Sequence, residues 1–157
     1  TFALLDQARA QLDARGVAFG PLKVGAMIEI PAAALSVKMF LRHFDFLSIG
    51  TNDLIQYTLA IDRADESVAH LYDPLHLVAD TIAECRAQGK GVSVCGEMAG
   101  DPSLTRLLLG LGLRSFSMHP TQILAVKQEV LRADALRLQT WAQQVMASDE
   151  PAELMGV

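Results

Sequence analysis

Four short apolar runs, separated by segments of helical period, constrain the fold of this chain more than any other feature. They cover residues 24–30, 44–49, 91–95 and 115–118. Each run is too short for a helix and is followed by a Gly, a Pro or a polar residue, which is typical of a buried strand. Strands that alternate with helices indicate an α/β fold with a parallel sheet.

The segments between and around these strands carry apolar residues at helical spacing. Asp101 and Pro102 are a strong start signal, because an acid at the N-cap and a proline at the first helical position both favour a helix. We expect residues 1–148 to form one domain and residues 149–157 a frayed tail. The predicted helices cover residues 1–16, 32–43, 77–88, 103–111 and 121–147, with a mixture of helix and loop over 54–76.

Polar residues stand at the carboxyl end of every predicted strand. They are Glu29, Asn52 with Asp53, Cys95 with Glu97, and His119. A (β/α)8 TIM-type barrel builds its active site from all of its strand ends, whereas an open parallel sheet concentrates its site at a switch point. Polar groups at four strand ends therefore favour the barrel. A full barrel needs about 250 residues, so four strand–helix units would form about half of one.

Composition and charge exclude several classes of protein. The chain is 51% hydrophobic and 20% charged, with a net charge of −5, which is typical of a globular domain and argues against nucleic-acid binding. No apolar stretch approaches the 18 or more residues of a membrane helix, and no signal peptide is visible. We therefore expect a cytoplasmic protein with reduced thiols at Cys85 and Cys95. A first residue of Thr1 instead of Met suggests a fragment.

Glu29 and Asp53 end consecutive strands, which would place the two carboxylates on neighbouring strands about 4.8 Å apart. Such a pair could hold Mg²⁺, leaving room for water and a substrate phosphate. The alternative is that each carboxylate caps a helix start. Asn52 and Thr51 could position a substrate oxygen or could simply satisfy a turn.

Arg63 and Cys95 are two further candidates. The planar guanidinium of Arg63 could clamp a carboxylate or phosphate, although a surface pair with Asp62 or Asp65 is the commoner arrangement. A thiol at a strand end, as at Cys95, could act as a proton donor or nucleophile. The alternative is a small buried hydrophobic residue, which is our interpretation of Cys85.

Five motifs in order carry a resemblance to a known family. The chain resembles the C-terminal, phosphoenolpyruvate-binding barrel domain of the enzyme I family, the phosphoenolpyruvate–protein phosphotransferases of the bacterial sugar phosphotransferase system. The resemblance extends from about Gly20 to Arg132 and implies the second half of the barrel. The motifs are MIEIP at 27–31, SIGTNDL at 48–54 continuing to DR at 62–63, HLY at 70–72, CGEMAG at 95–100 and FSM at 116–118.

The resemblance also implies roles for individual residues. Glu29 and Asp53 match the two carboxylates that bind Mg²⁺, and Asn52 and Arg63 match residues that hold the phosphate of phosphoenolpyruvate. Cys95 matches the cysteine that protonates the enolate carbon as pyruvate leaves. The implied reaction moves the phosphoryl group to an enzyme histidine and then to the carrier protein HPr, and positioning and charge neutralisation are what phosphoryl transfer requires.

The chain also departs from the family pattern. The phosphoacceptor histidine belongs to a separate N-terminal domain, which also contacts HPr, and none of the four histidines here matches it. Leu77 follows His76 directly, where the family continues with Pro and several more residues. His119 stands where the family has small residues, and we assign it no catalytic role. Because the first half of the barrel is absent as well, we expect the isolated chain to be inactive.

Two alternative interpretations remain open at this point. Pyruvate phosphate dikinase and phosphoenolpyruvate synthase share the barrel, although residues 70–74 are closer to enzyme I. A non-catalytic dimerisation module is the other alternative, because a half barrel leaves sheet edges unpaired. The enzyme I family dimerises through this domain, so the resemblance implies a homodimer.

Overall fold

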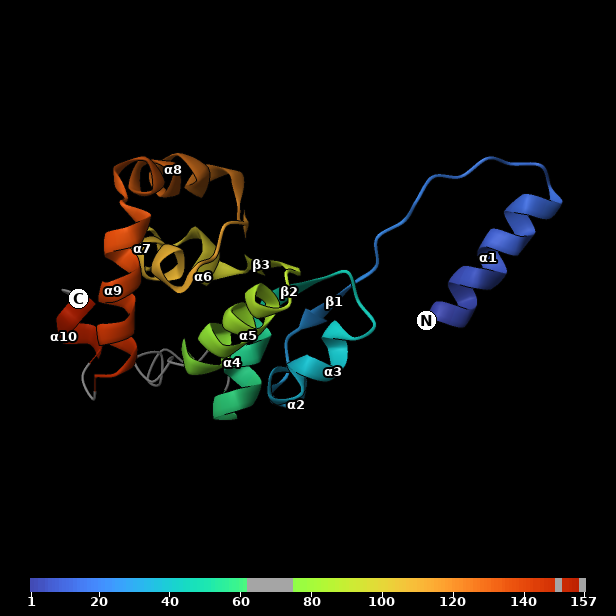
Figure 1. Cartoon of the computed structure of the whole chain (residues 1–157). Coiled ribbons are helices and arrows are strands. Elements are labelled where there is room, and N and C mark those ends of the chain that lie inside the picture. The colour runs from blue at the N-terminus through green and yellow to red at the C-terminus, as the bar shows by residue number, and fades with distance from the viewer. Residues whose placement is uncertain (62–74, 149–150, 156–157) are drawn as a thin grey trace.

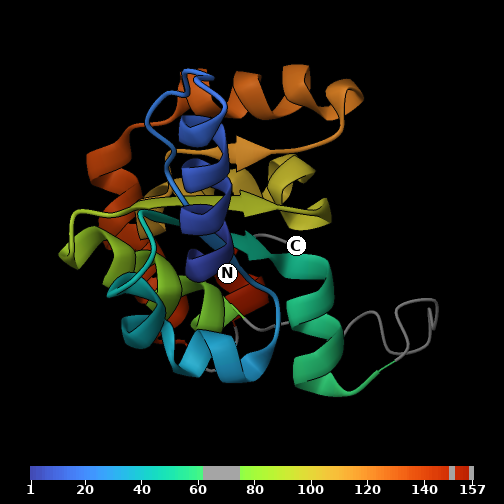
Figure 2. The ribbon, with the colours of Figure 1, turned by 90° about the vertical axis from the view of Figure 1, so that its right-hand side faces the viewer.

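The sheet of this protein has four parallel strands. The computed structural model describes residues 1–61, 75–148 and 151–155. In these residues the strands lie in chain order and all run the same way (Figure 2). The α/β fold with a parallel sheet is therefore confirmed. The strands are β1 (Gly25–Ile28), β2 (Phe46–Gly50), β3 (Gly91–Cys95) and β4 (Phe116–Ser117).

Helices connect successive strands, as parallel strands require (Figure 1). Each of the three connections contains two described helices: α2 and α3 precede β2, α4 and α5 precede β3, and α6 and α7 precede β4. The helices are α1 (Phe2–Ala14), α2 (Pro31–Leu35), α3 (Val37–Leu41), α4 (Thr51–Leu59), α5 (Leu75–Ala87), α6 (Glu97–Gly100), α7 (Pro102–Leu111), the 3₁₀ turn η2 (Pro120–Gln122), α8 (Ile123–Arg132), α9 (Ala135–Met146) and α10 (Pro151–Met155).

The two faces of the sheet differ in burial. The strand register aligns Ile28, Ile49 and Val94 in one row, and all three are fully buried in the hydrophobic core together with residues of the helices. The residues that alternate with this row point to the opposite face. On that face Met27 is 48% exposed and Phe46 is 40% exposed. One face therefore packs against the helices, and the other is open in the part of the chain described here.

Helix α1 stands apart from the sheet at the end of an extended segment, residues 17–24 (Figure 1). None of its residues is buried. The rings of Phe2 and Phe44 lie 5.4 Å apart, which places the start of the helix beside the loop that precedes β2. The packing of α1 therefore differs from that of the helices that cover the sheet.

Helix α7 begins as the sequence predicts. Asp101 is its N-cap and accepts a hydrogen bond from the Ser103 backbone N–H at 2.8 Å, with Pro102 in the first turn. The helix ends at Gly112, whose φ of 100° is easily reached only by glycine.

Two predicted helices are interrupted in the structure. Residues 32–43 form α2 and α3, which are separated at Ser36, where the backbone leaves helical geometry at φ −110° and ψ 20°. The single long helix predicted over 121–147 is also wrong, because Ala133 is extended and Asp134 caps a new helix. The Asp134 carboxylate accepts hydrogen bonds from the backbone N–H groups of Leu136 and Arg137, two and three residues further on.

This second break allows α9 to return across α7. Gly110 of α7 has the backbone of Leu138 and the side chain of Ala142 so close to its α-carbon that a β-carbon would collide with them. Beyond α9, residues 151–155 form α10 where the sequence predicted a frayed tail. The indole N–H of Trp141 donates to the Leu154 carbonyl at 3.3 Å, so α10 is tied to α9.

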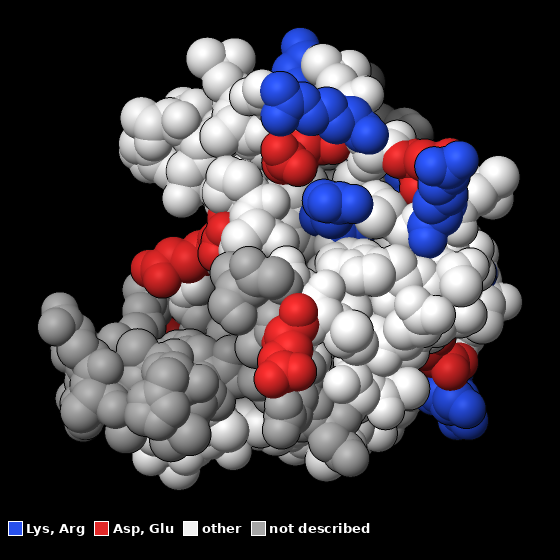
Figure 3. Space-filling model, turned by 90° about the vertical axis from the view of Figure 1, so that its left-hand side faces the viewer, with Lys and Arg blue, Asp and Glu red and all other residues white. Residues whose placement is uncertain are grey.

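Charged side chains are mixed in sign on the face that Figure 3 shows, where basic groups lie close to acidic ones and no continuous basic surface is visible. This arrangement agrees with the net charge of −5 and offers no footprint for nucleic acid on that face. Within the described ranges, no helix combines the length and the apolar character needed to cross a membrane.

Candidate active site

The strand register brings the predicted site residues to one edge of the sheet. Gly50, Cys95 and Ser117 pair side by side at the carboxyl ends of β2, β3 and β4. Glu29 directly follows β1, and Asp53 lies in the first turn of α4, which directly follows β2. The carboxyl ends of four strands thus contribute to one region, the position at which parallel α/β proteins build their sites.

The Glu29 side chain extends along the end of β2. A β-carbon placed on Gly50 would lie 3.1 Å from the Glu29 Cβ and 3.4 Å from its Oε2. The helix-capping alternative is wrong for Glu29, because the N-cap of α2 is Ile30 and no side chain caps that helix. Glycine at position 50 leaves the space that this carboxylate uses.

Asp53 is in the first turn of α4, where the positive end of the helix dipole stabilises a carboxylate. It is not the N-cap, since the N-cap of α4 is Gly50. Oxygen ligands from a small number of carboxylates suit Mg²⁺, which keeps several of its waters. Within the described ranges, no group of three or more His, Cys, Asp or Glu side chains is placed to hold a metal ion. Glu29 and Asp53 offer carboxylate oxygens, which are the ligands that Mg²⁺ prefers.

Thr51 and Asn52 tie the end of β2 to the end of β3. The Thr51 hydroxyl donates to the Cys95 carbonyl at 2.9 Å, and the Asn52 Oδ1 accepts from the Glu97 backbone N–H at 3.0 Å. The second bond fixes the orientation of the Asn52 amide, because its oxygen must face the N–H donor. Its Nδ2 group then points away from that bond, and it makes no hydrogen bond within the part of the chain that the structure describes.

Gly96 lies between these two hydrogen bonds. Its φ is 100° and its ψ is −171°, a combination that is essentially restricted to glycine. A β-carbon at this position would lie 2.7 Å from both the Asn52 Oδ1 and the Thr51 Oγ1. The turn after β3 therefore requires glycine both for its backbone and for its space.

The Cys95 thiol is reduced, half-buried and part of a hydrogen-bonded row on the open face of the sheet. Its Sγ donates to the Ile49 carbonyl at 3.4 Å and accepts from the Ser48 hydroxyl at 3.7 Å. Ser93 in turn donates to the Ser48 hydroxyl at 3.1 Å. Sequence reasoning missed both serines, although their alternation with buried strand positions would have identified the face they share.

Cys85 is a free thiol like Cys95 but differs from it in burial. It is fully buried in the core, as the sequence predicts. Burial, reinforced by the neighbouring charge of Glu84, raises the pKa of the Cys85 thiol to about 11. A thiol in this state remains protonated and unreactive at neutral pH.

A cavity of about 370 Å³ lies at the ends of β3 and β4. It combines residues that sequence reasoning selected with others that it missed, among them Ser117 and Gln122. Eight residues line it: Asn52, Cys95, Gly96, Glu97, Ser117, Met118, His119 and Gln122.

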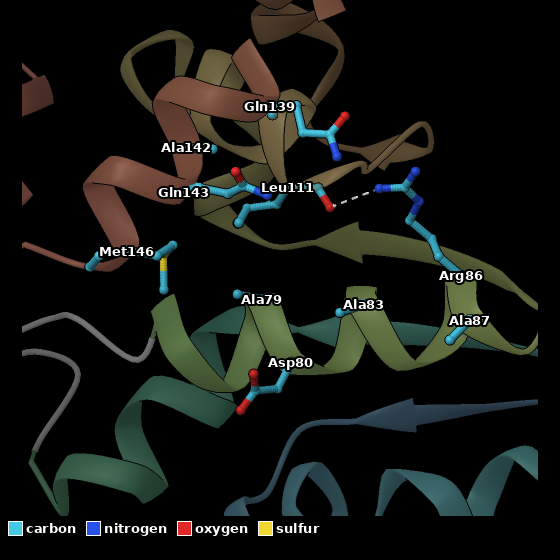
Figure 4. A pocket seen from close by; sticks show the side chains of 12 residues that line it. Ala79, Asp80, Ala83, Arg86, Ala87, Leu111, Gln139, Ala142, Gln143 and Met146 are labelled. Carbon is cyan, nitrogen blue, oxygen red and sulfur yellow. Dashed lines mark hydrogen bonds between the residues drawn. The ribbon is translucent and has the colours of Figure 1, made fainter. Parts of the chain in front are cut away.

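A larger groove, of about 710 Å³, lies between α5, α7 and α9 (Figure 4). Arg86 reaches across it, and its guanidinium donates to the Leu111 carbonyl at 3.4 Å. Its lining is rich in alanine, as at Ala79 and Ala83, and includes none of the residues at the strand ends. This groove is therefore a space between covering helices and is separate from the candidate site.

Arg63 lies in the segment 62–74, outside the residues that the structure describes. The HLY motif at 70–72 lies in the same segment. The phosphate-clamp role of Arg63 therefore stays a prediction, as do the metal, substrate and proton-donor roles of the other four site residues.

Carboxylates, an amide and a thiol at the ends of parallel strands occupy the position at which α/β enzymes, barrels included, build their active sites. Comparison with known proteins is more specific. Residues 1–135 match the family described as PEP-utilising enzyme, PEP-binding domain, where PEP is phosphoenolpyruvate. The chain belongs to this family.

Three curated relatives of the chain carry the name phosphoenolpyruvate-protein phosphotransferase. The protein from Cupriavidus necator is 64% identical over 98% of this chain, the one from Streptococcus equinus 45% over 92%, and the one from Haemophilus influenzae 38% over 97%. These matches span 27%, 26% and 28% of the relatives. The chain thus corresponds to about a quarter of the length of each relative.

Proposed function

We propose that residues 1–148 form the second half of the phosphoenolpyruvate-binding barrel of a phosphoenolpyruvate–protein phosphotransferase. The observation that carries this proposal is the alignment of Gly50, Cys95 and Ser117 at one sheet edge, with Glu29 and Asp53 beside it. Family membership and the shared name of the relatives support the same activity.

In this proposal Asn52 and Arg63 hold the phosphate of phosphoenolpyruvate. The bond from the Glu97 N–H to the Asn52 Oδ1 keeps the Nδ2 donor turned away from the backbone, where it can bind a phosphate oxygen. A guanidinium adds the charge and the paired N–H groups that a phosphate prefers.

Glu29 and Asp53 would hold Mg²⁺. When bound, this ion would neutralise charge on the phosphoryl group. The space above Gly50 lets the Glu29 carboxylate extend toward the neighbouring strand end. Asp53 lies in the first turn of α4, directly beyond the end of β2.

Cys95 would supply the proton that completes pyruvate. The P–O bond of phosphoenolpyruvate breaks, the phosphoryl group passes to a histidine nitrogen, and the enolate remains. The enolate carbon then takes the proton of the Cys95 S–H, and water later returns a proton to the thiolate. An S–H group is a weak hydrogen-bond donor, so the bond from Cys95 to the Ile49 carbonyl can break as the S–H turns toward the substrate.

The histidine that accepts the phosphoryl group would come from the part of the relatives that this chain does not cover. His43 is exposed in the turn that follows α3, and His76 is exposed in the first turn of α5. The later transfer to HPr likewise belongs to that other part. We therefore expect the isolated chain, incubated with phosphoenolpyruvate, Mg²⁺ and HPr, to release no pyruvate. Measurable pyruvate release would contradict the proposal that the phosphoacceptor histidine lies outside this chain.

The decisive experiment is Cys95→Ala in the full-length phosphotransferase, with pyruvate release measured by coupling to lactate dehydrogenase. We expect loss of pyruvate formation by a factor of about 10²–10⁴, the usual contribution of a proton donor. Ser93→Ala is the matched control, because it removes a hydroxyl from the same row without touching the thiol, and its rate should stay within a few-fold of the wild type. A Cys95→Ala variant that forms pyruvate at the wild-type rate would show that the thiol takes no part in the reaction.

A homodimer is a second proposal, supported by the exposed sheet. β1 and β4 are the edge strands, and Met27 and Phe46 expose apolar surface on the open face. Unpaired edges and apolar patches favour association with another chain. Light scattering should show a dimer at high concentration, and a stable monomer would contradict the proposal.

A further inference from the structure

The segment after β4 forms one wall of the 370 Å³ cavity that also contains Asn52 and Cys95. Family motifs gave this segment no role. His119 and Gln122 line the cavity from either end of the η2 turn. Both are nitrogen-bearing side chains, and they come from a different strand end than Asn52.

The hydrogen bonds of His119 fix the position of its proton. Its Nδ1 accepts from the Thr121 backbone N–H at 3.4 Å and lies 2.8 Å from the Thr121 hydroxyl. A backbone N–H can only donate, so Nδ1 is the acceptor in this contact and Nε2 is the nitrogen left to donate. The ring proton is then on Nε2, which makes no hydrogen bond with any described residue. His119 therefore offers one N–H donor while its other nitrogen holds the turn.

Gln122 is held against the backbone of Gly100. A β-carbon on Gly100 would collide with the Gln122 amide, so only glycine lets the amide occupy this place. The side chain is half-buried, and it makes no hydrogen bond within the described part of the chain. Its amide thus adds a second N–H donor to the same cavity wall.

Neutral N–H donors predominate over fixed charges in this cavity. No Lys or Arg is among its eight lining residues, and its one carboxylate, Glu97, is on an exposed side chain that can turn to solvent. Donors from Asn52, His119 and Gln122 face a common space. Convergent N–H groups bind the oxygen atoms of an anion, and a bond to a charged group is worth about 1.5–3 kcal/mol.

We propose that His119 Nε2 and the Gln122 amide donate hydrogen bonds to oxygen atoms of the anionic substrate, opposite Asn52. This inference rests on the proposed function and adds two binding residues to it. They position the substrate beside the Cys95 thiol and take no part in proton transfer. Their loss should therefore weaken binding more than turnover.

Three variants of His119 in the full-length phosphotransferase separate substrate contact from turn capping. His119→Asn keeps a short acceptor for the Thr121 N–H but loses the donor at the Nε2 position. His119→Gln places a donor near Nε2 but cannot cap the turn. His119→Ala loses both groups.

We expect His119→Ala and His119→Asn to raise the KM for phosphoenolpyruvate about 10-fold or more, which corresponds to about 1.4 kcal/mol. His119→Gln should stay within about 3-fold, and kcat should change little in all three. Gln122→Ala should also raise KM. His76→Ala is the matched control, because this exposed histidine is on α5 outside the cavity.

A wild-type KM for His119→Asn, with a raised KM for His119→Gln, would show a capping role and overturn the inference. A wild-type KM for His119→Ala would overturn it as well. Failure of the proposed function can be distinguished from failure of this inference, because in the first case the wild-type protein itself would release no pyruvate from phosphoenolpyruvate. Calorimetric titration with phosphoenolpyruvate provides the same comparison without turnover.

Discussion

Replacing Gly96 with alanine should damage the site and the fold together. The residue has φ 100° and ψ −171°, and its new β-carbon would lie 2.7 Å from the Asn52 Oδ1 and the Thr51 Oγ1. These two atoms make the hydrogen bonds that join the ends of β2 and β3. Gly96→Ala would therefore strain the backbone and also displace both side chains.

The size of the effect follows from these separate contributions. Holding alanine in a backbone region that is essentially restricted to glycine costs about 1–3 kcal/mol. Each lost hydrogen bond adds about 1 kcal/mol. We therefore expect the free energy of unfolding to fall by about 3–5 kcal/mol. Gly89→Ala is the matched control: Gly89 also has a positive φ, 64°, but nothing lies within 4 Å of its β-carbon position. Gly89→Ala should lower the free energy of unfolding by only about 1–2 kcal/mol.

Urea unfolding of the chain, followed by the fluorescence of its single tryptophan, Trp141, measures both losses. The difference between the two variants reports the collision with Thr51 and Asn52 together with any extra backbone strain at Gly96. Equal losses for Gly96→Ala and Gly89→Ala would refute the idea that these contacts hold the strand ends together. A loss below about 1 kcal/mol for Gly96→Ala would refute the backbone strain as well.

Three further predictions concern the rest of the chain. Asp101→Ala should lower the free energy of unfolding by about 1 kcal/mol, because α7 loses the cap to Ser103, and Asp101→Asn should restore most of it in the same urea assay. Leu108→Ala, in the core, should lower the free energy of unfolding by about 2–5 kcal/mol. Leu131→Ala, at a position 75% exposed, should lower it by less than about 0.5 kcal/mol. The pKa of Cys85 in the folded protein is raised to about 11 from 9.0, so its contribution to stability is complete below pH 9 and is lost as the pH rises through 11. The free energy of unfolding should therefore be lower at pH 10.5 than at pH 8, and a higher value at pH 10.5 would contradict the prediction.

The sheet could be predicted from the sequence because its strands are short, apolar and bounded by turn residues. The start of α7 at Asp101 was predictable for a similar reason, since its cap is a local signal. The break at Asp134 was not, because the apolar period continues on both sides of it. The break is explained by the packing of α9 against α7 at Gly110, where a β-carbon would collide with Leu138 and Ala142. That contact depends on tertiary structure.

Some features of the candidate site could likewise be predicted from the sequence, and others could not. The positions of Glu29 and Asp53 followed from strand ends, which the sequence shows. The hydrogen bonds from Thr51 to Cys95 and from Glu97 to Asn52 join residues more than 40 positions apart, so no local pattern reveals them. His119 was set aside because it matches no motif, yet its bonds to Thr121 orient its remaining donor.

The distribution of charge gives a physical reason why this chain should need other parts of the protein. The substrate proposed here is an anion with a phosphate and a carboxylate. Glu29, Asp53 and Glu97 all stand at the strand ends, and the described lining of the cavity contains neutral donors but no Lys or Arg. Neutral donors orient an anion, but they do not offset repulsion from three carboxylates. We therefore expect binding to need Mg²⁺, which Glu29 and Asp53 would hold, together with the charge of Arg63 and of cationic side chains from the rest of the proposed barrel. A chain that supplies orientation but little positive charge should bind phosphoenolpyruvate weakly by itself, and added Mg²⁺ should strengthen that binding more than added monovalent salt.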